Sequence, residues 1–201
     1  MAPSGASMER AAAPWKVAGI GLGMTPAEVA LAVKEDGYQL VRRSQGRSWQ
    51  GQVANQVRNL RSIKIQAGSQ VITNEQFRVG QEQILVTYTA GRAGPYVSQL
   101  DYFIDFEAIE ADNFRRAVLV KYGTPSVQWQ SELLYCAAGE TVCKRTGSLS
   151  TNQLPNLTVY IANASRRGLH LRQGERADKA YWAAVRAEAE RLYPKKDKPN
   201  F

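Results

Sequence analysis

Residues 84–105, with the sequence ILVTYTAGRAGPYVSQLDYFID, contain the pattern that decides the fold. Apolar side chains alternate with other side chains on both flanks of the central AGRAGP segment, residues 90–95. A period of two is typical of a strand, and a short connector rich in Gly and Pro is typical of a turn. The stretch therefore predicts an antiparallel β-hairpin.

Upstream of the hairpin, the segment LGMTPAEV (residues 22–29) has the features of a helix start. Thr25 can cap the helix, Pro26 suits its first position, and Glu28 can complete a capping box. Gly37 tolerates the left-handed conformation that ends many helices. These residues predict a helix that runs to about Asp36.

Four further groups of elements follow from spacing. Steps of three and four predict a second helix at Trp49, Val53, Val57 and Leu60, a third at Phe114, Ala117, Val118 and Tyr122 with a stop at Gly123, and a last one at Tyr181, Val185, Ala189 and Leu192. Strands are expected at 127–136, 157–161 and 169–172, and another within 63–77.

This order of elements predicts an α+β fold, in which helices pack on one face of an antiparallel sheet. Helix-then-strand order occurs twice, which suggests a tandem repeat of helix-plus-hairpin units. We expect a flexible N-terminal segment at 1–18, a first repeat at 19–105, a second repeat at 106–193 and a basic tail at 194–201. The two repeats are expected to form one compact domain.

The composition of the 201 residues is that of a folded, basic protein: 44% are hydrophobic, and the formal net charge is +8. No apolar run is long enough for a transmembrane helix. From residue 163 to the end there are ten Lys or Arg against five acids. This basic surface predicts an acidic partner, whereas no motif typical of nucleic-acid binding accompanies it.

Cys136 and Cys143 are separated by six residues and flanked by apolar segments. We expect a β-hairpin whose arms bring the two thiols into a disulfide, although two reduced, buried thiols are the alternative. A disulfide would indicate an oxidising compartment. The first residues lack the pattern of a secretory signal, so the cysteine pair alone favours a periplasmic location over a cytoplasmic one.

Two short motifs resemble known bacterial envelope proteins. Gly21-Leu22-Gly23-Met24-Thr25 with Glu28-Val29 and Gly37 is similar to the helix entry of small outer-membrane assembly lipoproteins. Phe114 and the segment 121–125 (KYGTP), followed by strands and a cysteine pair, resemble periplasmic proteins. The twofold element order is similar to the β-lactamase-inhibitor-protein fold, which implies binding of a protein through a concave sheet.

The sequence offers little reactive chemistry. Gly19-Ile20-Gly21-Leu22-Gly23 imitates a dinucleotide fingerprint, but its third glycine position is Met24. His170, the only histidine, alternates with two leucines, so we expect a surface or edge residue and no metal site. Paired carboxylates at Asp101, Asp105, Glu107 and Glu110 could serve a hydrolase. We expect no cofactor.

We therefore expect a non-catalytic protein-binding or scaffold protein of the bacterial cell envelope. The candidate partner-binding residues are a basic loop with an aromatic (Arg42, Arg43, Arg47, Trp49) and aromatic anchors on a sheet face (Tyr88, Tyr102, Trp129). Two alternatives stay open. One is a carboxylate-dependent hydrolase, and the other is a cytoplasmic subunit that binds nucleic acid through its basic C-terminal region.

Overall fold

Helix α1 (Pro26–Glu35) begins at the predicted capping box. The Glu28 carboxylate accepts the Thr25 backbone N–H at 2.7 Å, and the Thr25 hydroxyl accepts the Glu28 N–H at 3.4 Å. Gly37 follows the helix with a φ of 77°, a left-handed value that glycine adopts without strain. Both predicted ends of the helix are confirmed.

The computed structural model describes residues 13–63, 65–66, 68–138, 140, 143, 152–161 and 166–194. Eight strands form one antiparallel sheet in the order β3-β4-β5-β6-β10-β9-β8-β7. Their bounds are β3 Gln39–Arg47, β4 Gln70–Val79, β5 Glu82–Gly91, β6 Gly94–Asp105, β7 Val127–Gln128, β8 Glu132–Cys136, β9 Asn156–Tyr160 and β10 Arg166–Arg172. Strands β1 (Lys16–Val17) and β2 (Ile20–Gly21) form a separate small sheet.

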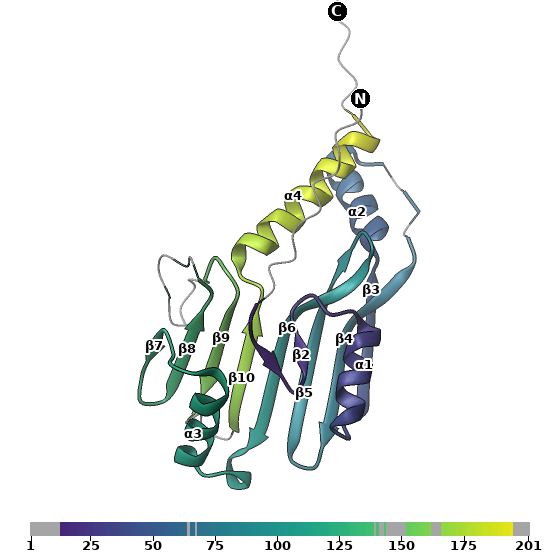
Figure 1. Cartoon of the computed structure of the whole chain (residues 1–201). Helices are drawn as coiled ribbons and strands as arrows, with labels where there is room; N and C mark the ends of the chain where they lie inside the picture. Colours follow the sequence, from purple (N-terminus) through teal and green to yellow (C-terminus); the bar gives the residue numbers. More distant parts are fainter. Residues whose placement is uncertain are drawn as a thin grey trace, which may run out of the picture.

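One face of the large sheet is covered by α1, by the β1–β2 hairpin and by α3 (Ala111–Tyr122), as Figure 1 shows. A short 3-10 helix at Phe106–Ala108 connects β6 to α3. Val29 of α1 and Phe114 of α3 belong to the same buried cluster as Ile84 and Leu100 of the sheet. The main core therefore lies between the sheet and these three elements.

Helices α2 (Trp49–Arg61) and α4 (Glu175–Leu192) pack against each other beyond one end of the strands (Figure 1). Their contact is a second buried cluster that includes Trp49, Val53, Tyr181 and Val185. The rings of Trp49 and Tyr181 meet edge to face, with centroids 5.6 Å apart. The spacing predicts both helices correctly, but it does not show that they pack on each other.

The α+β fold and its antiparallel sheet are confirmed, and the predicted hairpin is β5–β6, whose turn is shortened to residues 91–94. One prediction is wrong: the basic segment between the first two helices is not a loop but strand β3, at the edge of the sheet. From residue 13 onward, the N-terminal segment packs on the core, since Val17 is buried. The tail at 195–201 lies outside the described residues.

Within the described part of the chain, no helix is both long and apolar enough to cross a bilayer.

Candidate functional site

The face of the sheet opposite α1 and α3 carries rows of side chains that stand directly beside one another. Ile84, Leu100 and Leu171 point into the core, so their neighbours in sequence point to the opposite face. One row across β4, β5, β6, β10 and β9 consists of Gln76, Leu85, Asp101, His170 and Thr158. The next row consists of Asn74, Thr87, Gln99, Arg172 and Asn156.

His170 and Asp101 form a hydrogen-bonded pair at the middle of this face. His170 Nδ1 lies against Asp101 Oδ1, and the Gln99 side-chain amide donates to Asp101 Oδ2 at 2.9 Å. Both carboxylate oxygens of Asp101 therefore have partners, which fixes the orientation of the imidazole. The expectation of an edge histidine is wrong, since β10 is a central strand; the His170 side chain is 16% exposed, on the face opposite the core.

Phe103 lies next to this pair and is held by a glycine on the neighbouring strand. A Cβ built on Gly168 would come within 2.9 Å of Phe103 Cδ1, so the ring lies directly against the glycine backbone. Phe103 and Leu85 are both half-buried on this face. They supply apolar area among polar neighbours on rigid strands, an arrangement found at protein interfaces.

The exposure of this face is uneven. Over β8 and β9 it is buried, with Thr158 and Leu134 fully inaccessible. Over β4, β5, β6 and β10 most of its side chains are half-buried, whereas Asp101 is buried. We call this half-buried patch the open face; it comprises Gln76, Leu85, Thr87, Gln99, Phe103, His170 and Arg172.

Of the three aromatic anchors predicted from the sequence, none lies on the open face. Tyr88 is buried on the helix-covered side, and its hydroxyl donates to Glu75 at 2.5 Å. Burial, followed by this hydrogen bond to a carboxylate, raises the pKa of Tyr88. Trp129 lies between β7 and β8, where its backbone N–H donates to the Glu132 carbonyl at 2.8 Å.

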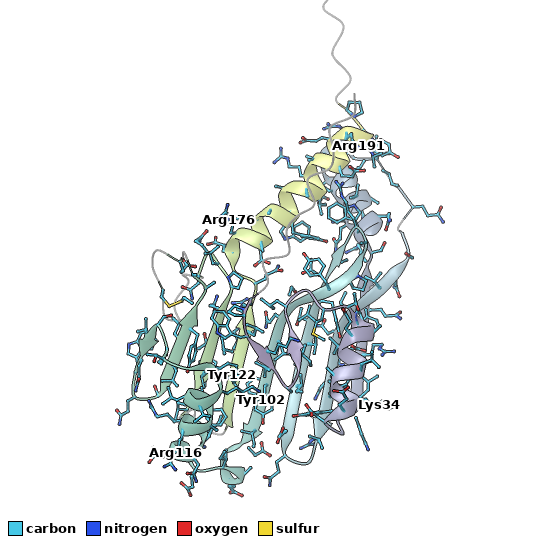
Figure 2. All side chains as sticks on the ribbon, viewed as in Figure 1. Lys34, Tyr102, Arg116, Tyr122, Arg176 and Arg191 are labelled. Atoms are coloured by element: carbon cyan, nitrogen blue, oxygen red, sulfur yellow. A yellow bond between two sulfur atoms is a disulfide. The ribbon has the colours of Figure 1, made fainter. Side chains whose placement is uncertain are left out.

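Tyr102 also packs against the main core, on the same side as Leu100. Figure 2 shows it close to Tyr122, and the two residues interact. Burial and the nearby Glu82 carboxylate raise the pKa of Tyr102. Because Tyr88 and Tyr102 point into the core, the prediction that they are surface anchors is corrected.

The predicted basic cluster is divided between an edge strand and a helix contact. Arg42 and Arg47 are exposed on β3. Arg43, between them, donates to the buried Glu75 carboxylate from Nε at 2.8 Å and from Nη2 at 2.6 Å. Trp49 is buried against α4, with the Arg92 guanidinium 5.2 Å from its ring centroid. Trp49 is therefore a core residue.

A groove of about 430 Å³ lies between α2 and α4. Its lining is mainly apolar, with Trp49, Val53, Val57 and Ile65 among the contributors. The same groove is lined by Arg92 and Glu188, which pair at 3.4 Å. The open face and this groove are thus distinct features of the surface.

Cys136 and Cys143 form the expected disulfide, with sulfurs 1.98 Å apart and Cα atoms 6.0 Å apart. Cys136 is the last residue of β8, but Cys143 belongs to the connection between β8 and β9. The bond therefore tethers a loop to a strand end, and the expected link between two hairpin arms is wrong in this respect.

Asp101, the buried member of the carboxylates considered for a hydrolase, lies apart from Asp105. Asp101 and Asp105 are four residues apart on β6, so about 13 Å of strand separates them. This exceeds the spacing of about 5–9.5 Å used by glycoside hydrolases. Glu107 and Glu110 are exposed beyond the strand end. A cluster of His, Cys, Asp or Glu suited to a metal ion is absent from the described residues.

The basic C-terminal region is more balanced than its sequence count indicates. Helix α4 carries four basic and four acidic residues. Three of its basic residues pair with acids on the same helix: Lys179 with Glu175, Arg186 with Glu190, and Arg191 with Glu188. Hydrogen bonding to Arg191 lowers the pKa of Glu188. Helix α4 therefore carries no net charge, and the net charge of +3 in residues 166–194 comes from Arg166, Arg167 and Arg172.

Sequence reasoning missed Leu85, Phe103 and the His170–Asp101 pair. The signal was present in the alternation, since the residues between the buried positions must face the other side. The sequence does not show that part of this second side stays accessible among the described residues, because that depends on where α2 and α4 pack. Comparison of the chain with models of protein families, with curated proteins and with solved structures found no match.

Proposed function

We propose that this protein is a non-catalytic protein-binding component of the bacterial cell envelope, and that it binds its partner through the open face. One observation carries the proposal. The main core lies on one side of the sheet, and on the opposite side the residues of the open face stay half-buried over four central strands.

The chemistry of the open face suits a protein ligand. Leu85 and Phe103 offer apolar area, while Gln76, Gln99 and Arg172 offer hydrogen-bonding groups around it. Strand backbone holds all five, so little backbone conformational entropy is lost when a partner binds. The resemblance to proteins that bind through a concave sheet remains part of this proposal.

An extracytoplasmic location is part of the same proposal. The Cys136–Cys143 disulfide supports it, because such bonds persist in oxidising compartments and are rare in the cytosol.

We further propose that residues 19–105 and 106–193 are diverged copies of one unit. Strands β3 to β6 are adjacent in chain order, as are β7 to β10, and each run is preceded by a helix, α1 or α3. The last strands of the two runs, β6 and β10, pair antiparallel. A helix-plus-four-strand unit fits this order better than the helix-plus-hairpin unit expected from the sequence.

Site-specific photocrosslinking in the native host tests the binding face. A benzophenone amino acid replaces Leu85 on the open face or, as the control, Val120, which is 84% exposed on α3. We expect a discrete crosslinked protein from position 85 and none from position 120. Equal crosslinking from both positions, or crosslinking from position 120 alone, would contradict the proposal.

A further inference from the structure

The positive charge of the protein is concentrated near one edge of the sheet. Residues 37–80, which include β3, α2 and β4, contain seven Lys or Arg and a single acid, Glu75. That acid is 1% exposed and pairs with Arg43, so within this stretch the other six Lys and Arg have no acid to offset them. The net charge of this stretch is therefore +6, and that of the whole chain is +8.

Strand β3 is the edge of the sheet in this basic region. In the described chain it pairs only with β4, so its outer backbone groups face away from the sheet. All its residues except Ser44 and Gly46 are exposed, including Leu40 and Val41 at 45% and 57%. A nine-residue edge with exposed apolar side chains is a template for a further strand.

The irregularities of the ladder leave a continuous outer edge. Val41 is the extra residue on β3 between the paired Leu40 and Arg42. At the second irregularity the extra residue is Thr73 on β4, opposite Ser44 and Gln45. Residues 42–47 of β3 therefore carry no bulge of their own, so six consecutive residues can pair on the outer side.

We propose that the outer edge of β3 binds an extended acidic segment of a partner protein as an added antiparallel or parallel strand. This inference rests on the proposed protein-binding function and adds a second contact outside the open face. Backbone hydrogen bonds to residues 42–47 would hold the segment, as in strand addition to other sheet edges. Acidic side chains would pair with Arg42 and Arg47, and apolar ones would cover Leu40 and Val41.

Charge and chemistry favour this occupant over two others. A second copy of the chain would place its own Arg42, Arg43 and Arg47 beside the same residues, and directly opposed like charges destabilise strand pairing. A nucleic acid would satisfy the arginines, but a phosphate backbone has no N–H donors for the strand carbonyls. It would also leave Leu40 and Val41 exposed.

A peptide titration tests the proposal. Arg42 and Arg47 are five positions apart in a segment without a bulge, so they face opposite sides of the sheet. The probe is therefore an end-capped octapeptide with the repeat Glu-Glu-Val-Val, which places Glu and Val on both faces of a strand. Its control is the same peptide with alternate backbone amides methylated. The protein variants are Arg42→Glu with Arg47→Glu, and the matched control Arg116→Glu with Arg176→Glu on α3 and α4 (Figure 2). All four arginines are exposed. Each double variant replaces two positive charges by two negative charges, so both variants change the net charge equally.

We expect the unmodified peptide to bind and to slow hydrogen exchange at alternate amides of residues 42–47. The β3 double variant should bind it at least about tenfold more weakly. The α3–α4 control should stay within about twofold of the wild type, and the methylated peptide should not bind, because it keeps the charge but loses the backbone donors.

Four results would overturn the inference. They are equal weakening in both double variants, tighter binding of duplex DNA than of the peptide, a β3-dependent dimer in sedimentation, and slow exchange of the outer β3 amides in the free protein. If the peptide experiment contradicts the proposal for β3, the proposal for the open face still stands, because crosslinking from position 85 is measured in a separate experiment.

Discussion

At the scale of single residues, Glu75 is the least expected feature. It is a carboxylate 1% exposed in a sheet core, and it accepts hydrogen bonds from Tyr88 and from Arg43. A buried charge is tolerated only when it is paired and hydrogen-bonded, which is why these three side chains occur together. Sequence alternation placed Tyr88 on one side of its strand, but it could not reveal that Glu75 is its partner.

Tyr88→Phe removes one hydrogen bond to this buried carboxylate. We expect the free energy of unfolding to fall by about 1.5–3 kcal/mol, the range for hydrogen bonds to charged groups. Denaturant unfolding measures it. Tyr193→Phe, at a position that is exposed, serves as the control and should change stability by less than about 0.5 kcal/mol. Equal stability of Tyr88→Phe and the wild type would show that the bond is not stabilising.

At the scale of elements, local signals predict the helices well and the edge strand poorly. Caps and apolar spacing define α1, and Gly123 follows the last residue of α3, because these signals lie within a few residues of the structure they set. Strand β3 was missed because an edge strand with exposed side chains needs no alternating apolar pattern. Its sequence, QLVRRSQGR, is therefore also typical of a loop.

The cap of α1 gives a prediction at this scale. Thr25→Ala removes the side chain that accepts the Glu28 N–H, and the loss should lower the free energy of unfolding by about 1 kcal/mol. Thr25→Ser keeps the hydroxyl and should retain most of that stability. Thermal or denaturant unfolding of the two variants provides the measurement, and an equal loss in both would assign the effect to the methyl group instead.

At the scale of the whole molecule, the decisive feature is the pairing of β6 with β10, from Gln99 with Arg172 to Asp105 with Arg166. This contact joins two four-strand runs into one sheet and brings Asp101 beside His170. It links residues about 70 positions apart, and no local signal specifies such a pairing. The sequence therefore predicts the class of fold and most elements, but not the open face.

Several tyrosines buried in this architecture make the fold sensitive to alkali. Burial raises the pKa of Tyr181 to about 12, and burial also raises the pKa of Tyr38, Tyr88, Tyr102 and Tyr122. In the unfolded chain these phenols ionise near about pH 10, so there the unfolded state loses protons before the folded state does. The contribution of these protonated, buried phenols to the free energy of unfolding is complete below about pH 10, and it is lost as the pH rises above that value.

Denaturant unfolding at a series of pH values checks this expectation. The free energy of unfolding should be steady between about pH 8 and about pH 9 and fall steeply by about pH 11. Tyrosinate absorbance should rise together with unfolding. Full ionisation of the tyrosines in a protein that remains folded would contradict the burial described above.

The central claim is that the main core lies on one side of the sheet and that an accessible binding face lies on the other side, over β4, β5, β6 and β10. Hydroxyl-radical footprinting of the free protein tests it with chemically identical reporters, Leu85 on the open face and the fully buried Leu100 on the core side. The account predicts that Leu85 is oxidised several-fold faster than Leu100. Equal protection of the two leucines would mean that the open face is covered, and would contradict the account.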